Sequence, residues 1–162
     1  MSSVGKITPL LDPARIVLQM PGADRGTVLH AIAHLLDGHP DVTSFPGFFG
    51  ELLTRDRLDT TCLGHGIALP HARTTHVQKI VLAVGRTVTP ILFDQTSDPV
   101  RLFFVLGTPK SKPGDYLTVL STLCKLLRDP ANREALMSAE TPVAFIAAIA
   151  AAEEKLLAPS PA

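Results

Sequence analysis

The residues best suited to chemistry are three clustered histidines, His65, His71 and His76. His71 ends the stretch Gly-His-Gly-Ile-Ala-Leu-Pro-His, which begins at residue 64. We expect the apolar part of this stretch to anchor in the core, while Pro70 fixes the backbone torsion φ just before the histidine. The imidazole of His71 is then held at the edge of an element, as a nucleophile requires, because its attacking nitrogen must be closely aligned.

The charge around these histidines is unusual for the chain. The 15 basic residues cancel the 15 acidic ones, but residues 60–93 contain no Asp or Glu and include Arg73, Lys79 and Arg86. This local deficit favours a dianionic group such as a phosphoryl, whose oxygens match the planar fork of arginine. The zero net charge and the lack of a basic run argue against a nucleic-acid binder.

A zinc site built from the three histidines is the metal alternative. Their spacing matches neither a compact zinc finger nor a helical i, i+4 pair, and neither Cys62 nor Cys124 belongs to a Cys-x-x-Cys pair. His30 and His34 are four residues apart on an expected helix, and we interpret them as surface histidines. The sequence therefore predicts no metal site and no cofactor.

Elements that could position these residues alternate along the chain. Two continuous apolar runs, at residues 80–84 and 100–106, are typical of strands covered on both faces, and a further strand is expected at residues 15–20. Helices are expected from the capping residue Asp24 to Gly38, around residues 48–58, from Pro113 to Arg128, and from Thr141-Pro142 onward. The pattern predicts an α/β fold in which helices flank the sheet on both faces.

The expected helices also predict which side chains enter the core. The apolar faces comprise Val28, Ala31, Ile32, Leu35 and Leu36 in the first helix, and Leu117, Leu120, Cys124 and Leu127 in the helix that begins at Pro113.

The length of 162 residues predicts one domain, which we place at residues 1–157, with residues 158–162 as a flexible tail. The longest apolar stretch, residues 143–152, is too short for a membrane span of about 20 residues. Residues 1–10 lack the apolar core of a secretory signal, and two cysteines fit a reducing compartment. We expect a cytoplasmic protein without membrane insertion.

Together these residues resemble the active-site motif of the phosphotransferase-system (PTS) enzyme IIA family of type 2, the fructose, mannitol and nitrogen-regulatory type. The family pattern has an Arg-acid pair, a Thr, a Gly-x-Gly-Ile-Ala-x-Pro-His core, and a small residue followed by Lys or Arg. Here it reads Thr54-Arg55-Asp56-Arg57-Leu58, then Thr61-Cys62-Leu63-Gly64-His65-Gly66-Ile67-Ala68-Leu69-Pro70-His71-Ala72-Arg73. The resemblance extends from about Ile16 to the last helix.

The resemblance implies a phosphocarrier built on a mixed sheet flanked by helices. In such proteins the histidine that corresponds to His71 accepts a phosphoryl group from a phosphohistidine on the small carrier HPr or its nitrogen-branch counterpart. The linkage is through the imidazole nitrogen distal to the backbone. Arg55 corresponds to the site arginine of the family and is expected to hold the phosphoryl group. Arg73 is a second candidate for phosphate binding, and Thr61 is a candidate hydroxyl donor.

The chain departs from the family at one position. A second active-site histidine usually stands just before a Leu at the start of the late helix, whereas this chain has Tyr116 before Leu117. A tyrosine hydroxyl can still donate a hydrogen bond to a phosphate or to His71, but it does not become cationic near neutral pH. His65, where the family more often has another polar residue, is a secondary candidate to substitute in part.

The first hypothesis is thus a stand-alone IIA-like phosphocarrier of the phosphotransferase type. It has two possible roles: regulation of a target protein, or sugar uptake with transfer of phosphate to a IIB subunit. Because no IIB or membrane portion is fused to the chain, we expect regulation. The second hypothesis, motivated by Tyr116, is a non-catalytic protein-binding module that keeps the fold.

Overall fold

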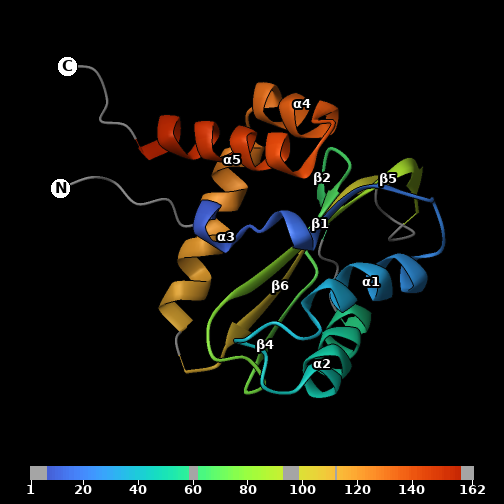
Figure 1. Cartoon of the computed structure of the whole chain (residues 1–162), viewed down its shortest axis with the longest axis vertical. Coiled ribbons are helices and arrows are strands. Elements are labelled where there is room, and N and C mark those ends of the chain that lie inside the picture. Colours follow the sequence, from blue (N-terminus) through green and yellow to red (C-terminus); the bar gives the residue numbers. More distant parts are fainter. Residues whose placement is uncertain (1–6, 59–61, 93–98, 112, 158–162) are drawn as a thin grey trace.

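The computed structural model describes residues 7–58, 62–92, 99–111 and 113–157, without the side chains of residues 56–58, 62, 63 and 113. The predicted alternation of strands and helices is only partly present: in the described part of the chain, one strand and two α-helices are followed by five successive strands and then by three α-helices (Figure 1). The strands are β1 (Ile16–Met20), β2 (Cys62–Gly64), β3 (Ile67–Ala68), β4 (His71–Thr74), β5 (Val81–Ile91) and β6 (Val100–Pro109). The α-helices are α1 (Arg25–Ala33), α2 (Phe45–Leu58), α3 (Pro113–Leu127), α4 (Pro130–Ser138) and α5 (Pro142–Leu157). The short 3-10 helices are η1 (Thr8–Leu10), η2 (Pro13–Arg15) and η3 (His34–Leu36).

The strands of the described residues form one mixed sheet of six strands. Its order is β1-β5-β6-β3-β2, and β4 follows β3 along the same edge of β6. Strand β6 is antiparallel to β5 and parallel to both β3 and β4. The predicted α/β fold is confirmed, and the long central strand β6 is the element against which the histidine-bearing strand β4 is aligned.

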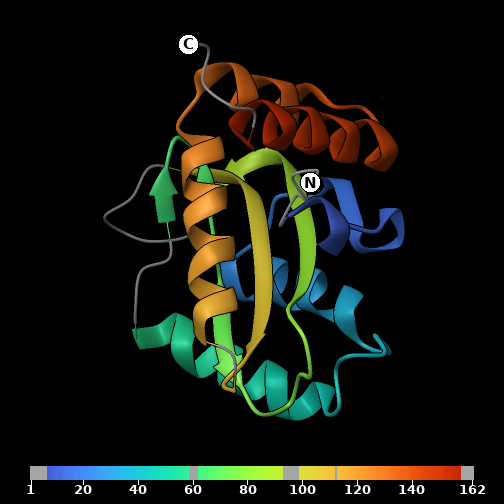
Figure 2. The same cartoon turned by 90° about the vertical axis from the view of Figure 1, so that its left-hand side faces the viewer.

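Helices cover both faces of this sheet. Alternate residues of β6 enter different clusters, with Leu102, Phe104 and Leu106 on one face and Phe103 and Val105 on the other. Helices α3, α4 and α5 pack on the first face, and α1 and α2 pack on the second (Figure 2). The continuous apolar runs therefore arise because the strands are buried on both faces.

Two predicted core positions are wrong. Leu117 is 63% exposed, because α3 buries Val119, Leu123 and Leu126 and so faces the sheet with a stripe rotated from the predicted one. Ala31 is also exposed, on the outer side of α1. The sequence did not predict helix α4 or the strands β2, β3 and β4, and these strands are too short to show a periodicity. Among the described helices, none is long and apolar enough to cross a membrane.

A buried carboxylate on α5 holds the 3-10 helix η1 by hydrogen bonds. Glu153 in α5 is 2% exposed. The amide of Ile7 donates to its Oε2 (3.0 Å), and the amide of Thr8 donates to its Oε1 (2.7 Å). The hydroxyl of Thr8 donates to the same Oε1 (2.5 Å). These charge-assisted bonds fix η1 against α5.

We predict that Glu153→Ala lowers the free energy of unfolding by about 2–3 kcal/mol, because donors that the carboxylate satisfied lose a charged acceptor. Urea denaturation measures this change. The matched control is Glu154→Ala, since the neighbouring Glu154 is exposed on the same helix. Equal stability losses in the two variants would contradict the role of Glu153.

Candidate functional site

The segment that precedes His71 is anchored as the sequence predicted. Ile67, Ala68 and Leu69 are buried, with at most 3% of each side chain exposed. The carbonyl of Pro70 accepts a hydrogen bond from the amide of Leu106 (3.0 Å), and His71 stands opposite Leu106 in the parallel pairing of β4 with β6. This pairing fixes the chain direction at His71 and the position of His71 along strand β6.

Two hydrogen bonds define the state of the His71 ring. Its Nδ1 lies 2.7 Å from the carbonyl oxygen of Leu69, and since a carbonyl only accepts, Nδ1 carries the proton. In the neutral ring Nε2 therefore has a lone pair. The hydroxyl of Tyr116, at the start of α3, lies 3.0 Å from Nε2 and donates to it. The ring is half-buried, and its Nε2 faces the Tyr116 hydroxyl.

His71 lines a cavity of about 550 Å³ where α2, β4, the end of β6 and the start of α3 meet. Three cationic side chains line it with His71, each from a different element: Arg55 from α2, Arg73 from β4 and Lys110 just after β6. The Arg73 guanidinium carbon lies 5.7 Å from the centre of the Tyr116 ring, within the range of a cation–π contact. The cavity therefore combines a nucleophilic nitrogen with a concentration of positive charge.

One carboxylate belongs to the same cavity. Glu51 lies one helical turn before Arg55 on α2, and its Oε2 is enclosed without a hydrogen-bond partner among the described residues. The acid-poor stretch of the sequence gave no sign of it, because Glu51 comes from outside that stretch. Thr54 also lines the cavity, although its hydroxyl donates to the carbonyl of Gly50 (3.0 Å).

Comparison with known proteins places these features in a family. Residues 9–152 match the family model described as phosphoenolpyruvate-dependent sugar phosphotransferase system, EIIA 2. The chain belongs to this EIIA family. It is 31% identical to a nitrogen regulatory protein of Pseudomonas aeruginosa, over 84% of this chain and 89% of that protein. It is 32% identical to a fructose-specific EIIA component of Haloferax volcanii, over 87% of this chain and 90% of that protein.

A solved structure agrees with the sequence relatives. The nitrogen regulatory protein IIA-Ntr from Neisseria meningitidis superimposes with a TM-score of 0.80 at 30% sequence identity. The match covers 88% of this chain and 98% of that one. The mixed sheet flanked by helices is thus the fold of the EIIA family, as the resemblance implied.

Several of the residues singled out in the sequence meet in the cavity, namely Arg55, His71, Arg73 and Tyr116. His65 does not line it. It occupies the tip of the β2–β3 turn with φ 57°, between Gly64 and Gly66, which also have positive φ. The side chain of His65 is exposed there. Thr61 lies outside the described residues.

The other basic residues of the acid-poor stretch, Lys79 and Arg86, do not line the His71 cavity. Arg86 is 6% exposed and donates to the backbone carbonyls of Leu18 (3.3 Å) and Leu136 (2.8 Å). Its burial, and then the nearby charge of Arg101, lower its pKa. Of Arg73, Lys79 and Arg86, only Arg73 lines the His71 cavity. Lys110, which the sequence did not single out, lines it as well.

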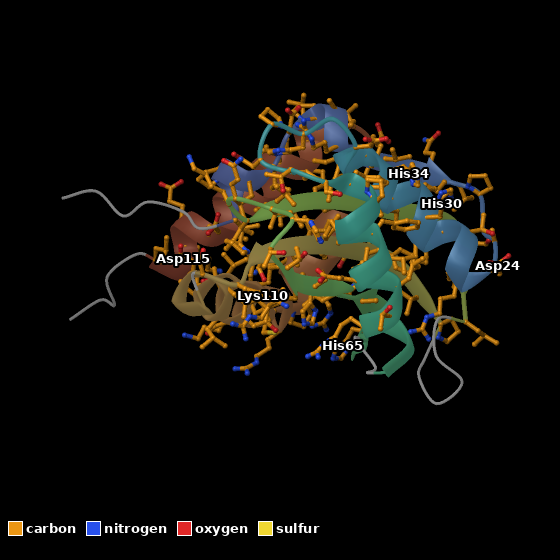
Figure 3. The ribbon with its side chains drawn as sticks, turned by 90° about the horizontal axis from the view of Figure 1, so that it is seen from below. Asp24, His30, His34, His65, Lys110 and Asp115 are labelled. Carbon is orange, nitrogen blue, oxygen red and sulfur yellow. The ribbon has the colours of Figure 1, made fainter. Side chains whose placement is uncertain are left out.

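The remaining histidines lie apart from this site. His30 and His34 are exposed on the far side of α2 from Lys110 (Figure 3), where their rings pack against Phe49. Within the described part of the chain, no three metal-ligating side chains converge. His76 is half-buried against Gly47, where an added Cβ would lie 2.6 Å from the imidazole.

We predict that neutral His71 is the Nδ1–H tautomer, because the carbonyl of Leu69 accepts from that nitrogen. Long-range 1H–15N correlation spectra of the imidazole rings report which nitrogen is protonated. The Tyr116→Phe variant is the control, since it removes the contact at Nε2 and leaves the bond to Leu69, so the same tautomer is expected. A proton on Nε2 in the wild-type protein would contradict this geometry.

Proposed function

We propose that this EIIA-family protein is a phosphocarrier of the nitrogen-regulatory type, and that Nε2 of His71 accepts a phosphoryl group from a phosphohistidine carrier, HPr or its nitrogen-branch counterpart. The observation that carries the proposal is the bond from Nδ1 of His71 to the carbonyl of Leu69 (2.7 Å). It leaves the lone pair on Nε2, which faces a cavity lined by three cations.

The transfer is a displacement at phosphorus. The lone pair of Nε2 forms the new N–P bond while the N–P bond of the carrier breaks, and the leaving imidazole of the carrier retains that electron pair. The two nitrogens must lie roughly in line, with the three equatorial oxygens facing donors. Tyr116 releases Nε2 at this stage, and its hydroxyl can then donate to a phosphoryl oxygen.

The cationic side chains have the role of holding the phosphoryl oxygens. Arg55 and Arg73 present planar forks suited to paired oxygens, and Lys110 adds a compact charge. Glu51 opposes them, because a carboxylate in the same cavity repels a dianion.

The similarity to nitrogen regulatory proteins favours the regulatory role over sugar uptake. Nitrogen regulatory proteins match both by sequence and by structure, at 31% and 30% identity. The fructose-specific component matches at 32%, so transfer to a IIB subunit is the second candidate function. Regulation implies a target protein that distinguishes the phosphorylated from the unphosphorylated form.

The same proposal takes residues 1–157 as one domain. Residues 158–162, which we expect to form a tail, lie outside the described residues.

We predict that incubation with phosphoenolpyruvate, enzyme I and a carrier of either branch yields an acid-labile phosphoryl adduct on the wild-type protein. The adduct is expected to be absent from His71→Ala and present in the control His30→Ala, since His30 is exposed outside the cavity. Intact-protein mass spectrometry detects it. The lack of an adduct with both carriers would favour the non-catalytic binding module, and an adduct on His71→Ala would exclude His71 as the acceptor.

A second prediction concerns Tyr116, which stands where the family usually has histidine. Tyr116→His is expected to raise the rate constant of phosphotransfer at least about tenfold, because a cationic imidazole stabilises the transferring group better than a neutral phenol. Rapid-quench kinetics measures the rate. The matched control is Leu117→His, which introduces the same side chain at the adjacent, exposed position. Equal rates in the two variants would show that position 116 is not special.

A further inference from the structure

A second cavity adjoins the His71 cavity, since Pro109 and Asp115 line it while their chain neighbours Lys110 and Tyr116 line the cavity of His71. Its volume is about 500 Å³, which is in the range of small-molecule sites. Its walls come from η1, the segment after η3, the two residues before β5, the end of β6 and the first turns of α3. None of its lining residues belongs to the phosphoryl site, and the proposed phosphotransfer makes no use of it.

Part of the lining of this cavity is apolar, and we call this part the apolar floor. Leu10, Ile80, Pro109 and Val119 contribute to it. Pro109 is buried and Val119 is 5% exposed, so these side chains join the cavity to the core beneath it. A floor of this composition fits a short branched hydrocarbon group.

Charged groups of both signs surround the floor. Asp41 and Asp115 supply two carboxylates, and Lys79 supplies one ammonium group. Among the described residues, no ion pair joins any two of these three charges. They converge on one cavity from three separate segments. Such a set matches a ligand that carries both a cationic and an anionic group.

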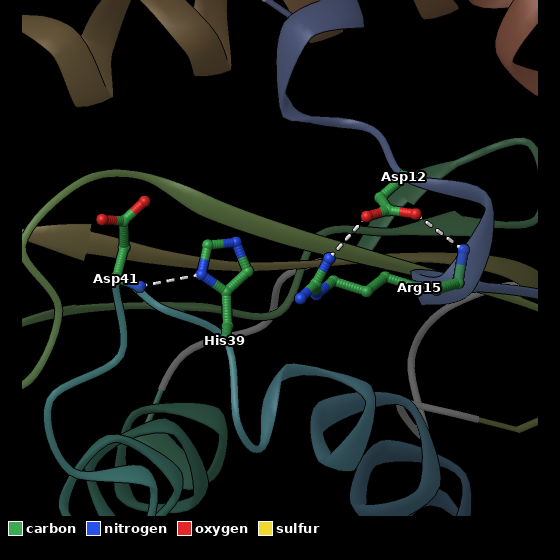
Figure 4. Close-up of polar contacts among 5 residues, drawn as sticks. Asp12, Arg15, His39 and Asp41 are labelled. Carbon is green, nitrogen blue, oxygen red and sulfur yellow. Dashed lines mark hydrogen bonds and ion pairs between the residues drawn. The ribbon is translucent and has the colours of Figure 1, made fainter.

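His39 adds a neutral donor to the same wall. Its Nδ1 accepts a hydrogen bond from the amide of Asp41 (3.0 Å), so the neutral ring carries its proton on Nε2 (Figure 4). Burial of the imidazole, and then the positive charge of Arg15, lower the pKa of His39 below its ordinary value of 6.5. Near neutral pH the ring is therefore uncharged, and its Nε2–H group can donate without adding positive charge.

We propose that this cavity binds a small zwitterion with an apolar side chain, of which a branched aliphatic α-amino acid is the simplest. The ammonium group of the ligand lies between Asp41 and Asp115, its carboxylate accepts from Lys79 and His39, and its hydrocarbon group covers the apolar floor.

The position of the cavity couples such a ligand to the phosphoryl site. Asp115 at the rim directly precedes Tyr116, whose hydroxyl donates to His71, and Pro109 in the floor directly precedes Lys110. The two cavities thus share the end of β6 and the first turn of α3 as a common wall. Only the effect of the ligand on phosphotransfer rests on the proposed function, because binding itself is measurable on the unphosphorylated protein.

The test is a titration of the 15N-labelled full chain, unphosphorylated, with L-leucine, L-isoleucine and L-valine, followed in 1H–15N correlation spectra. We expect saturable shifts at residues around the cavity and a smaller shift at Tyr116. Two leucine analogues isolate the charges: 4-methylpentanoate lacks the ammonium group, and isoamylamine lacks the carboxylate. Each is expected to bind about tenfold or more weakly, since each loses charge-assisted hydrogen bonds.

Substitutions in the cavity separate this site from adventitious binding. Asp41→Asn and Asp115→Asn are each expected to weaken L-leucine about tenfold, and Lys79→Met similarly. Asp37→Asn is the matched control, because Asp37 is exposed and does not line the cavity, and its affinity is expected to equal that of wild type. The same spectra verify that each variant is folded.

Three results would overturn the proposal. The first is the absence of a saturable shift with all three amino acids. The second is an affinity that neither aspartate substitution changes. The third is a set of shifts confined to the lining of the His71 cavity. If binding is confirmed while no phosphoryl adduct forms on His71, the cavity is a ligand site on a protein without phosphotransfer, so the two proposals fail independently.

Discussion

The bond from Nδ1 of His71 to the carbonyl of Leu69 is the constraint on which the site depends. It selects the tautomer, turns the ring, and leaves Nε2 as the only nitrogen with a lone pair. The bond holds because the residues before it are immobilised: the apolar run at 67–69 is buried, and the carbonyl of Pro70 is paired with Leu106 of the central strand. A flexible loop could not keep the ring aligned for an in-line displacement.

The same central strand brings the charges together. Strand β4 lies parallel to β6, so the end of β6 delivers Lys110 beside Arg73. Helix α2 approaches closely because Gly107 leaves room for Phe48, whose ring would lie 2.8 Å from an added Cβ. That approach places Arg55 and Glu51 in the wall of the cavity. The positive site is thus a product of the sheet register and of one close helix–sheet contact.

The sequence predicted the parts of this arrangement that depend on local pattern. The apolar runs indicated strands covered on both faces, the Pro-His stretch indicated His71 as a candidate nucleophile, and the resemblance to the EIIA family added Arg55 and Tyr116. Lys110 and Glu51 were not predicted. Lys110 reaches the site through the pairing of β4 with β6, and Glu51 through the packing of α2, and neither contact can be recognised from the neighbouring sequence. Leu117 was wrong because an amphipathic helix with apolar residues on two sides can face the sheet with either one, and packing of Val119 and Leu123 decided it.

The central claim is that Nε2 of His71 carries the phosphoryl group, and its linkage can be observed directly. Protein labelled with 15N in histidine and phosphorylated by its carrier shows a 15N–31P coupling on the nitrogen bonded to phosphorus. The account predicts this coupling on Nε2 of His71, with Nδ1 still protonated and bonded to Leu69. A coupling on Nδ1, or on the ring of any other histidine, would contradict it.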